Sequence, residues 1–238
     1  MGFIRSLNFH YKEWIAFVIC VLSVITGIIF YPMMPQLMAS HWGINGAADG
    51  YMSAFWGSVL MPLVIVAMFL LFVFIPRADP LKKNIDLFKG HFLNFILILL
   101  LFMYALQVFE IAWNLNYKMD IIFVIVPLFA ILFFYTGVML SNAKQNMTIG
   151  IRTPWTLKSK KSWDMTHKRT GTLLKIISVV FLLGLVFRRQ EFLILIVPLL
   201  LVFLYAFVYS YVVYEIEHKN NGMYNKENKM NKTPPKKH

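Results

Sequence analysis

The sequence predicts an all-α membrane protein, a six-transmembrane-helix bundle with both termini in the cytoplasm. The first reason is composition. Of the 238 residues, 59% are hydrophobic and 14% are charged, against about 45–50% and about 25% in soluble domains. Six long apolar stretches are the second reason, and the uneven placement of Lys and Arg is the third. This composition argues against a soluble enzyme or a soluble binding domain.

A hydrocarbon core of about 30 Å is crossed by about 20 helical residues. Helices that cross it are expected at 14–31, 55–75, 92–113, 121–140, 173–187 and 192–214. The fifth stretch is short, so its helix is expected to begin earlier and to let Lys175 reach the interface. The first stretch is interpreted as an uncleaved anchor, because no small-residue cleavage site follows it.

Basic residues set the orientation, because loops rich in Lys and Arg stay in the cytoplasm. With the N-terminal segment 1–13 inside, the 23 Lys and Arg residues divide unevenly, and the outer segments hold only Lys118, Arg188 and Arg189. A multi-pass protein of the plasma membrane follows. Attraction to anionic inner-leaflet lipids accounts for the net charge of +12, without direct binding of nucleic acid. The basic tail 215–238 is expected to be disordered.

Three prolines recur at a similar depth in the helices that return to the inner side, namely Pro62, Pro127 and Pro198. Proline removes a helical hydrogen bond and kinks the helix. Two explanations remain open. The kinks splay three helix hairpins around an outward-facing cavity, or they reflect the ordinary frequency of proline in membrane helices.

The first helix hairpin, 14–75, includes an outer loop at 32–54 that contains no Lys or Arg. Its turn pairs are Asn45-Gly46 and Asp49-Gly50, which predict a compact, tightly turned cap. His41 and Asp49 could supply two metal ligands or an acid–base pair. No third ligand stands nearby, so no metal and no other cofactor is expected.

The inner segment 141–172 lies within a four-helix region, 92–214, and is richer in polar motifs. Thr153-Pro154 prevents simple continuation of the fourth helix. Ser159 is a candidate N-cap for a short helix that ends near His167. Trp163 and His167 are four residues apart and share a face. With Trp155, the segment is expected to lie along the interface with its aromatic side toward lipid.

Arg152 allows two interpretations. Its guanidinium can bind a phosphate or a carboxylate through two hydrogen bonds. It can equally be an arginine that reaches the interface from a basic loop, or one that holds the loop in place. The second interpretation accounts for Arg152 alone and leaves the surrounding motif unexplained.

The surrounding motif resembles the signature of the Sdp immunity protein (SdpI) family. It consists of Gly150, Arg152, Thr153, Pro154, Trp155, Thr156, Leu157, Trp163, Thr166, His167 and Arg169. The outer loop is similar to the small domain of unknown function that precedes this signature, through Pro35, His41, Trp42, Gly46, Asp49 and Gly50. The resemblance covers nearly all of residues 10–214.

The resemblance implies a membrane protein that protects its host from a secreted, membrane-active peptide toxin. It also implies signalling, in which the toxin-engaged protein captures a cytoplasmic repressor at the membrane. The expected partners are thus the lipid bilayer, a peptide toxin on the outer loop and a repressor on the inner segment. The chain is expected to act by binding, because no hydrolase, metalloprotease or nucleotide-binding motif occurs in the sequence.

A transporter of a small solute or an ion is the alternative. Glu110 is the carboxylate that lies within a predicted span, and acids inside the membrane are functional candidates by default. Glu110 is, however, one turn from Asn114 and close to the outer end of its helix, where water can reach it. A transporter would more often show several polar residues at the midplane and broken helices in matched halves.

Overall fold

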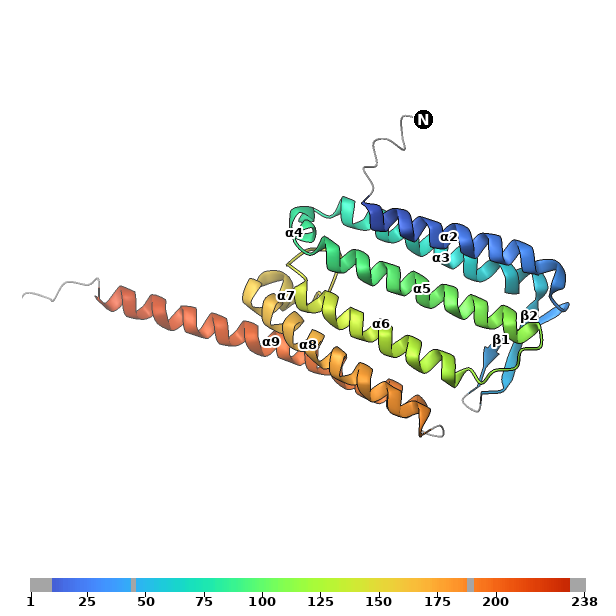
Figure 1. The fold of residues 1–238 in the computed structure, drawn as a ribbon. Coiled ribbons are helices and arrows are strands. Elements are labelled where there is room, and N and C mark those ends of the chain that lie inside the picture. Colours follow the sequence, from blue (N-terminus) through green and yellow to red (C-terminus); the bar gives the residue numbers. More distant parts are fainter. Residues whose placement is uncertain (1–9, 44–45, 188–190, 232–238) are drawn as a thin grey trace, which may run out of the picture.

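A computed structural model describes residues 10–43, 46–187 and 191–231. Its elements are α2 (Tyr11–Phe30), η1 (Tyr31–Met33), β1 (Leu37–Trp42), β2 (Ala48–Ser53), α3 (Ala54–Ala78), α4 (Lys82–Asp86), α5 (Lys89–Asn114), α6 (Ile122–Asn142), α7 (Pro154–Lys158), α8 (Lys160–Phe181), η2 (Leu182–Leu185) and α9 (Glu191–Asn231). The long helices run along one common direction (Figure 1).

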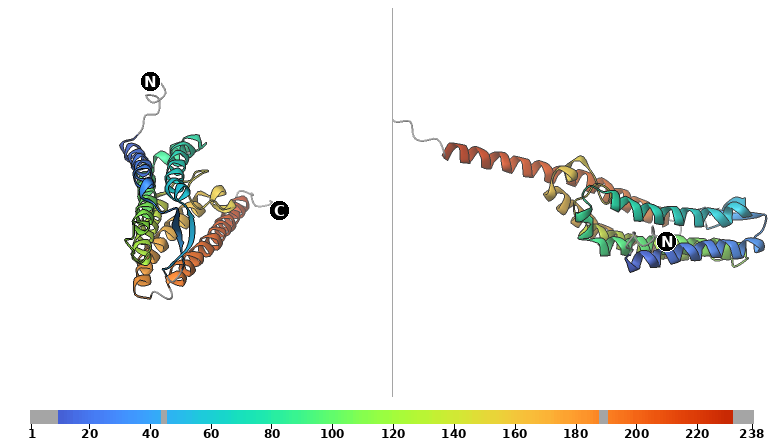
Figure 2. Two further views of the ribbon diagram at one scale, coloured as in Figure 1. Left: turned by 90° about the vertical axis from the view of Figure 1, so that its right-hand side faces the viewer. Right: turned by 90° about the horizontal axis from the view of Figure 1, so that it is seen from above.

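Two layers of helices make up the bundle. Helices α2, α5, α6 and α8 form one row in this order, and each contacts the next. Helices α3 and α9 lie on one side of this row, α3 against α2 and α5, and α9 against α8 (Figure 2). The strands β1 and β2 lie at one end, called the hairpin end. Residues 143–159, which connect α6 to α8, lie at the other, called the connection end (Figure 1).

Five described helices are long and apolar enough to cross a membrane: Tyr11–Met33, Ala54–Ala78, Lys89–Asn114, Ile122–Asn142 and Leu193–Asn220. They correspond to five of the six predicted spans, so a largely helical membrane protein is confirmed. Their outer faces carry exposed apolar side chains, among them Ile28, Leu63 and Leu204. A surface with so many exposed apolar side chains is more stable in contact with lipid than with water.

The fifth predicted span, 173–187, belongs to a helix that begins earlier, as expected for so short an apolar stretch. Helix α8 starts at Lys160, continues without a break to Phe181 and is followed by η2. The prediction of a short interfacial helix that ends near His167 is therefore wrong. The prediction of Ser159 as its N-cap is confirmed, because the Ser159 hydroxyl accepts a hydrogen bond from the Ser162 N–H at 2.9 Å.

A close approach of two backbones explains why the polar part of α8 stays within the bundle. A Cβ atom placed on Gly137 of α6 would lie 2.5 Å from the carbonyl oxygen of Gly171 of α8. Only glycine permits such contact, and small residues are the usual means by which membrane helices pack tightly. Trp163 is consequently enclosed between helices and is fully buried. The expectation that its ring faces lipid is wrong.

The C-terminal helix is longer than predicted. Residues 215–231, expected to be disordered, continue α9 to Asn231 (Figure 1). The rest of the predicted tail, 232–238, lies outside the described residues. A helix that is already nucleated by a preceding span can continue without an apolar face.

The outer loop forms an antiparallel β-hairpin, which an all-α prediction did not include. Leu37 pairs with Ser53, Met38 with Met52, and Trp42 with Ala48, with register shifts on both sides of His41. Met38 is fully buried against the bundle. In β2 half-buried and exposed residues alternate along the strand, as expected when one face of a strand is covered.

Pro62 and Gly27 mark the closest approach of α2 and α3. A Cβ atom on Gly27 would lie 2.6 Å from the Ser58 carbonyl oxygen, whose usual helical donor is missing because residue 62 is proline. Pro62 borders an apolar groove between these two helices. The grooves described here do not bring Pro62 together with Pro127 and Pro198, so a common cavity stays a prediction.

Candidate functional site

The connection end is organised by two buried polar side chains, Asn146 and Asp79. The amide of Asn146 accepts hydrogen bonds from the Thr148 and Ile149 N–H groups at 2.9 and 2.6 Å. Its nitrogen donates to the Lys144 and Ile149 carbonyls at 2.8 and 2.9 Å. Four local bonds to one fully buried side chain fix the start of the connection.

Asp79, at the end of α3, ties this turn to the first half of the chain. One carboxylate oxygen accepts hydrogen bonds from the Met147 N–H at 2.9 Å and the Thr148 hydroxyl at 2.7 Å. The other accepts from the Leu81 N–H at 2.7 Å. Asn84 of α4 adds a bond to the Gln145 carbonyl at 2.7 Å. Bonds to an ionised acceptor are among the stronger hydrogen bonds in proteins.

His167 holds the middle of the connection. Its Nε2 accepts a hydrogen bond from the Ile151 N–H at 2.9 Å, so Nδ1 carries the proton and donates to the Trp163 carbonyl at 2.8 Å. The imidazole stacks on the Trp163 ring, with centroids 4.0 Å apart. Burial lowers the pKa of His167 to about 4, so the side chain is neutral at pH 7.

Gly150 makes this arrangement possible. Its φ of +115° lies in the left-handed region, and a Cβ atom at this position would run into the imidazole of His167. Trp163 completes the cluster by donating from Nε1 to the Ala143 carbonyl at 3.0 Å. Gly150, Trp163 and His167 are thus a structural cluster in the centre of the connection.

Thr153, Pro154 and Thr156 form the start of α7. Thr153 and Thr156 bond reciprocally as a capping box, and Pro154 occupies a first-turn position that needs no N–H. The Thr153 hydroxyl also donates to Ser210 Oγ at 3.0 Å. Trp155 packs on the rings of Phe207 and Tyr211. These contacts anchor α7 on α9.

Leu157, Ser159 and Thr166 extend the same anchorage. Leu157 packs against the hydrophobic core. Ser159 bonds to Glu217 of α9, and the Ser162 hydroxyl donates to the Ser210 carbonyl at 2.7 Å. Thr166 is fully buried, and its hydroxyl has no hydrogen-bond partner among the described residues.

Arg152 is exposed, whereas Thr153 and Thr156 next to it are buried. One guanidinium nitrogen donates to the Met147 carbonyl at 2.6 Å. The side chain therefore does hold the loop, and this bond uses only one of the five N–H groups of the guanidinium. Arg169 lies apart from the cluster, with its guanidinium 6.0 Å from the centre of the Tyr209 ring.

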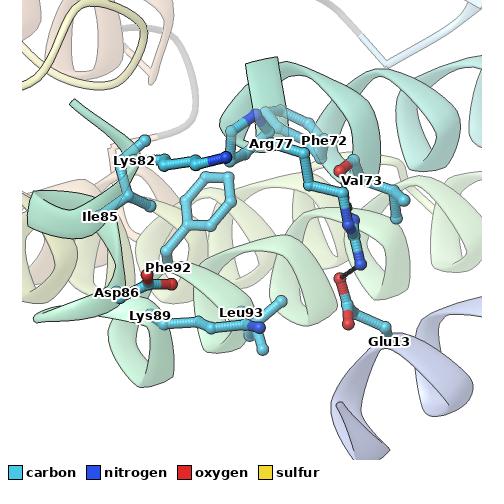
Figure 3. Close-up of a pocket in the computed structure, with 11 residues that line it drawn as sticks. Glu13, Phe72, Val73, Arg77, Lys82, Ile85, Asp86, Lys89, Phe92 and Leu93 are labelled. Carbon is cyan, nitrogen blue, oxygen red and sulfur yellow. Dashed lines mark hydrogen bonds and ion pairs between the residues drawn. The ribbon is translucent and has the colours of Figure 1, made fainter. Parts of the chain in front are cut away.

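A small cavity of about 110 Å³ lies at the same end, between the start of α2 and the end of α3. Figure 3 shows Arg77 facing Glu13 across it, with Lys82 and Lys89 at its border. Arg77 bonds to the buried Glu13 carboxylate at 2.8 Å, and the other Glu13 oxygen accepts from the His10 N–H at 2.7 Å. This pair joins α2 to α3 just before Asp79.

The hairpin end presents His41 and Asp49 together. Nδ1 of His41 lies 2.5 Å from an Asp49 carboxylate oxygen, and the two side chains are 72% and 55% exposed. Gly50 lies opposite His41, where a Cβ atom would approach the His41 Cβ to 2.8 Å. Gly46, with φ +75°, turns beside Asp120. Asn45, the other member of that turn pair, lies outside the described residues.

Trp42 has a different role from these two residues. Its ring packs on Phe109 and Trp113 of α5, with centroids 5.0 and 5.6 Å away. Asn114 holds the neighbouring strand residue, because its amide accepts from the Ala39 N–H at 2.8 Å and donates to the Ala39 carbonyl at 2.9 Å. Trp42 and Asn114 fasten the hairpin to the bundle, and Glu110 lies buried one turn before Asn114.

The structure therefore separates the predicted residues into two distant groups. The signature residues other than Arg152 and Arg169 gather into one packed network at the connection end, and the outer-loop residues gather at the hairpin end. Among the described residues, no group of three or more His, Cys, Asp or Glu side chains lies close enough to hold a metal ion. The structural roles of Asp79, Asn146 and Asn114 were not predicted from the sequence. Each is a polar residue near the end of a helix, and nothing in its local sequence identifies its hydrogen-bond partners.

Comparisons with known proteins agree with this division of the chain. Residues 18–66, from α2 through the hairpin to α3, match the model of a domain of unknown function, DUF1648. Residues 142–210, which include the connection, α8 and part of α9, match the SdpI/YfhL protein family. No solved structure matches the chain.

One curated relative extends the likeness over nearly the whole chain. The immunity protein SdpI of Bacillus subtilis (strain 168) is 29% identical over 211 residues, which are 89% of this chain and 98% of that protein. The resemblance seen in the sequence is thereby confirmed: the chain carries an SdpI/YfhL family domain preceded by DUF1648.

Proposed function

We propose that this chain is a membrane immunity protein, which protects its host from a secreted, membrane-active peptide toxin. The observation that carries the proposal is the likeness to the immunity protein SdpI, which leaves only 2% of that protein unmatched. A likeness of that extent includes both the hairpin and the connection, rather than one shared domain.

The proposed topology has six membrane crossings with both termini in the cytoplasm. Helix α8 supplies the sixth crossing. Its apolar second half and the η2 turn, within 173–187, make this crossing. They extend about 22 Å at 1.5 Å per residue, so the bilayer is expected to thin locally around them. Ser162, His167 and Thr170 of its first half are buried, whereas its basic residues are exposed and are expected at the membrane surface. Basic residues concentrate at the connection end, which favours the cytoplasm for that end.

In this orientation the hairpin end faces the side from which a secreted toxin arrives. His41 and Asp49 are its exposed polar pair, whereas Trp42 supports the hairpin from below. We therefore assign toxin contact to His41 and Asp49. Gly46 and Gly50 shape the surface on which this pair is displayed.

The connection end faces the cytoplasm and is proposed as the docking surface for a repressor. Arg152 is the candidate contact, because it is exposed and keeps donors that Met147 does not use. A guanidinium in that state can bind a carboxylate of a partner protein through two hydrogen bonds. The cluster that Gly150 forms with the buried Trp163 and His167 gives Arg152 a fixed position.

A survival experiment tests the proposal. Cells sensitive to an Sdp-type toxin are transformed with the wild-type chain, with His41→Gln, with Asp49→Asn, and with Tyr51→Phe as the control on the same hairpin. Membrane levels are matched by immunoblot. Wild type and Tyr51→Phe should protect, and the other two variants should lose protection. If all four chains protect equally, His41 and Asp49 are not the contact, and if none protects, immunity to this toxin is refuted.

The repressor half needs its own readout. Cytoplasmic proteins that co-purify with the chain are compared with and without toxin, in wild type and in Arg152→Gln. Lys158→Gln, an exposed cation at the same end, is the matched control. A toxin-dependent partner that is lost only in Arg152→Gln supports the assignment. Equal recovery from all three chains contradicts it.

A further inference from the structure

A long groove separates α8 from α9 on the outer surface of the bundle. Its volume is about 810 Å³, and both polar and apolar side chains line it. Lys168, Arg169 and Tyr209 contribute the polar part, and Leu173, Leu201 and Val202 the apolar part. Arg169 is the residue of this groove that belongs to the signature, and the function proposed above assigns it no contact. The groove is distant from the hairpin end.

The polar part of the groove lies nearer the connection end, and the apolar part lies deeper along the proposed membrane normal. Arg169 and Tyr209 face each other across the groove, near Ser162 and Ser210, which are bonded to each other at the connection end. Because α8 and α9 are antiparallel, Leu173 on α8 and Leu201 on α9 lie deeper, toward the middle of the bundle. The groove therefore has its cations at the membrane surface and its apolar walls in the hydrocarbon region.

The two cations in the groove have no acidic partner. Asp164, one turn before Lys168, is engaged by Lys160 at 2.6 Å. Among the described residues, neither Lys168 nor Arg169 forms an ion pair. The apolar wall is equally without a protein partner, since the side chain of Leu201 is 60% exposed. One occupant that satisfies both parts must carry an anion at one end and a hydrocarbon chain at the other.

We propose that this groove binds one anionic phospholipid of the surrounding leaflet. Lys168 and Arg169 hold the phosphate and the rest of the headgroup, and one acyl chain lies along Leu173, Leu201 and Val202. Basic pockets between membrane helices are suited to such headgroups. Tyr209, which contacts the Arg169 guanidinium, places an aromatic ring at the level of the headgroup, where tyrosine is favoured.

A second hydrocarbon chain has a place next to the first. A shallower groove of about 370 Å³ lies along α9 and shares Leu201, Tyr205 and Tyr209 with the larger one. The rings of Tyr205 and Tyr209 are stacked, with centroids 5.2 Å apart, and form a ridge between the two grooves. A lipid with two chains can straddle this ridge with its headgroup on the two cations.

Native mass spectrometry of the full-length chain tests the site. The protein is released from nanodiscs that contain equal amounts of phosphatidylglycerol and phosphatidylcholine, and the lipids retained are counted. Lys168→Gln/Arg169→Gln is compared with wild type and with Lys158→Gln/Lys161→Gln, which removes the same charge from exposed positions outside the groove. Thermal melting confirms that all three chains are folded.

Wild type and the control should each retain one phosphatidylglycerol tightly, and the groove variant should bind it about twenty-fivefold more weakly, because each cation near an anionic surface contributes about fivefold. A parallel titration with glycerophosphate should fail to displace the lipid, since the chains contribute to binding. Equal retention of both lipids, equal loss in both variants, or displacement by glycerophosphate overturns the proposal. A dimer that disappears only in the groove variant also overturns it, because the occupant is then a second copy.

Discussion

The Asp79 carboxylate accepts a hydrogen bond from the Thr148 hydroxyl at 2.7 Å, across 69 positions of the sequence. Asp79 lies in neither of the two segments that match family models, whereas Thr148 lies in the segment that matches the SdpI/YfhL family, two residues before Gly150. This contact, together with the bond from Asn84 to the Gln145 carbonyl, joins the end of the first helix hairpin to the connection. The end of α3 is therefore bonded directly to the segment that displays Arg152.

Replacement of Asp79 should weaken the connection. Asp79→Asn keeps the shape but leaves one acceptor oxygen for three donors, so at least one buried donor loses its bond. We expect a loss of about 2 kcal/mol in the free energy of unfolding. Thermal melting in detergent measures it, and limited proteolysis at residues 143–159 should become faster. Asp86→Asn, an exposed carboxylate close by, is the control, and an equal shift for both variants would contradict the assignment.

Gly150 should tolerate no side chain. Gly150→Ala places a methyl group against the His167 imidazole and keeps a residue with φ +115°, so a loss of about 2 kcal/mol or more is expected from strain and displaced packing. Gly90→Ala is the matched control, because a Cβ atom there meets nothing within 4 Å. Within a helix it should be neutral or stabilise by up to about 1 kcal/mol. Melting curves that rank the two variants in the opposite order would refute the role of Gly150.

His167 makes stability depend on pH in a known direction. Burial holds its pKa in the folded protein at about 4, below the usual value of 6.5, so the unfolded chain takes up the proton first as the pH falls. The contribution of His167 is complete above pH 6.5 and is lost as the pH falls from 6.5 through 4, up to about 3 kcal/mol. Chemical unfolding at several pH values measures the slope.

His167→Gln should flatten this slope, since glutamine does not titrate, although it also removes the stacking on Trp163. The exposed His218, changed to Gln, is the control and should leave the slope unchanged. A wild-type slope that persists in His167→Gln would assign the pH dependence to another group.

The five apolar helices could be predicted from the sequence because hydropathy is a local property. Helix α8 could not, since Lys160 to Thr172 looks like a surface segment until Gly137 and the α9 residues Ser210 and Glu217 are placed beside it. The spacing of Trp163 and His167 correctly indicated a shared face. The spacing did not indicate whether this face packs against lipid or against another helix. The close approach of Gly171 to Gly137 shows that α8 packs against α6.

The candidate sites show the same limit. The exposed residues of the hairpin and Arg152 could be chosen from turn pairs and motifs. Asp79 and Asn114 could not, because their partners are 69 and 75 positions away, and a polar residue at a helix end has no local feature that identifies such a partner.

Asn114 should be required for the position of the hairpin. Asn114→Ala removes both bonds to the backbone of Ala39, which is 1% exposed, so two buried polar groups lose their partner, at a cost of about 2 kcal/mol. Faster proteolysis of residues 37–53 and loss of toxin protection are expected together. Asn142→Ala, whose amide bonds only within its own helix, is the control. Proteolysis unchanged in Asn114→Ala would refute the role of Asn114 in holding the hairpin.

The number of crossings can be decided by labelling single cysteines in intact cells. Cys20→Ser removes the native thiol, and one cysteine is then introduced by Tyr51→Cys, Lys161→Cys or Lys219→Cys, all exposed positions. With six crossings and a cytoplasmic N-terminus, a membrane-impermeant maleimide labels position 51 in intact cells, and labels positions 161 and 219 only after permeabilisation. If α8 instead lies on the membrane surface, α9 alone crosses after residue 161, and position 219 is labelled from outside while 161 is not. The bonds of Ser159 and Ser162 to α9 hold the start of α8 beside the C-terminal part of α9, so positions 161 and 219 should lie on one side.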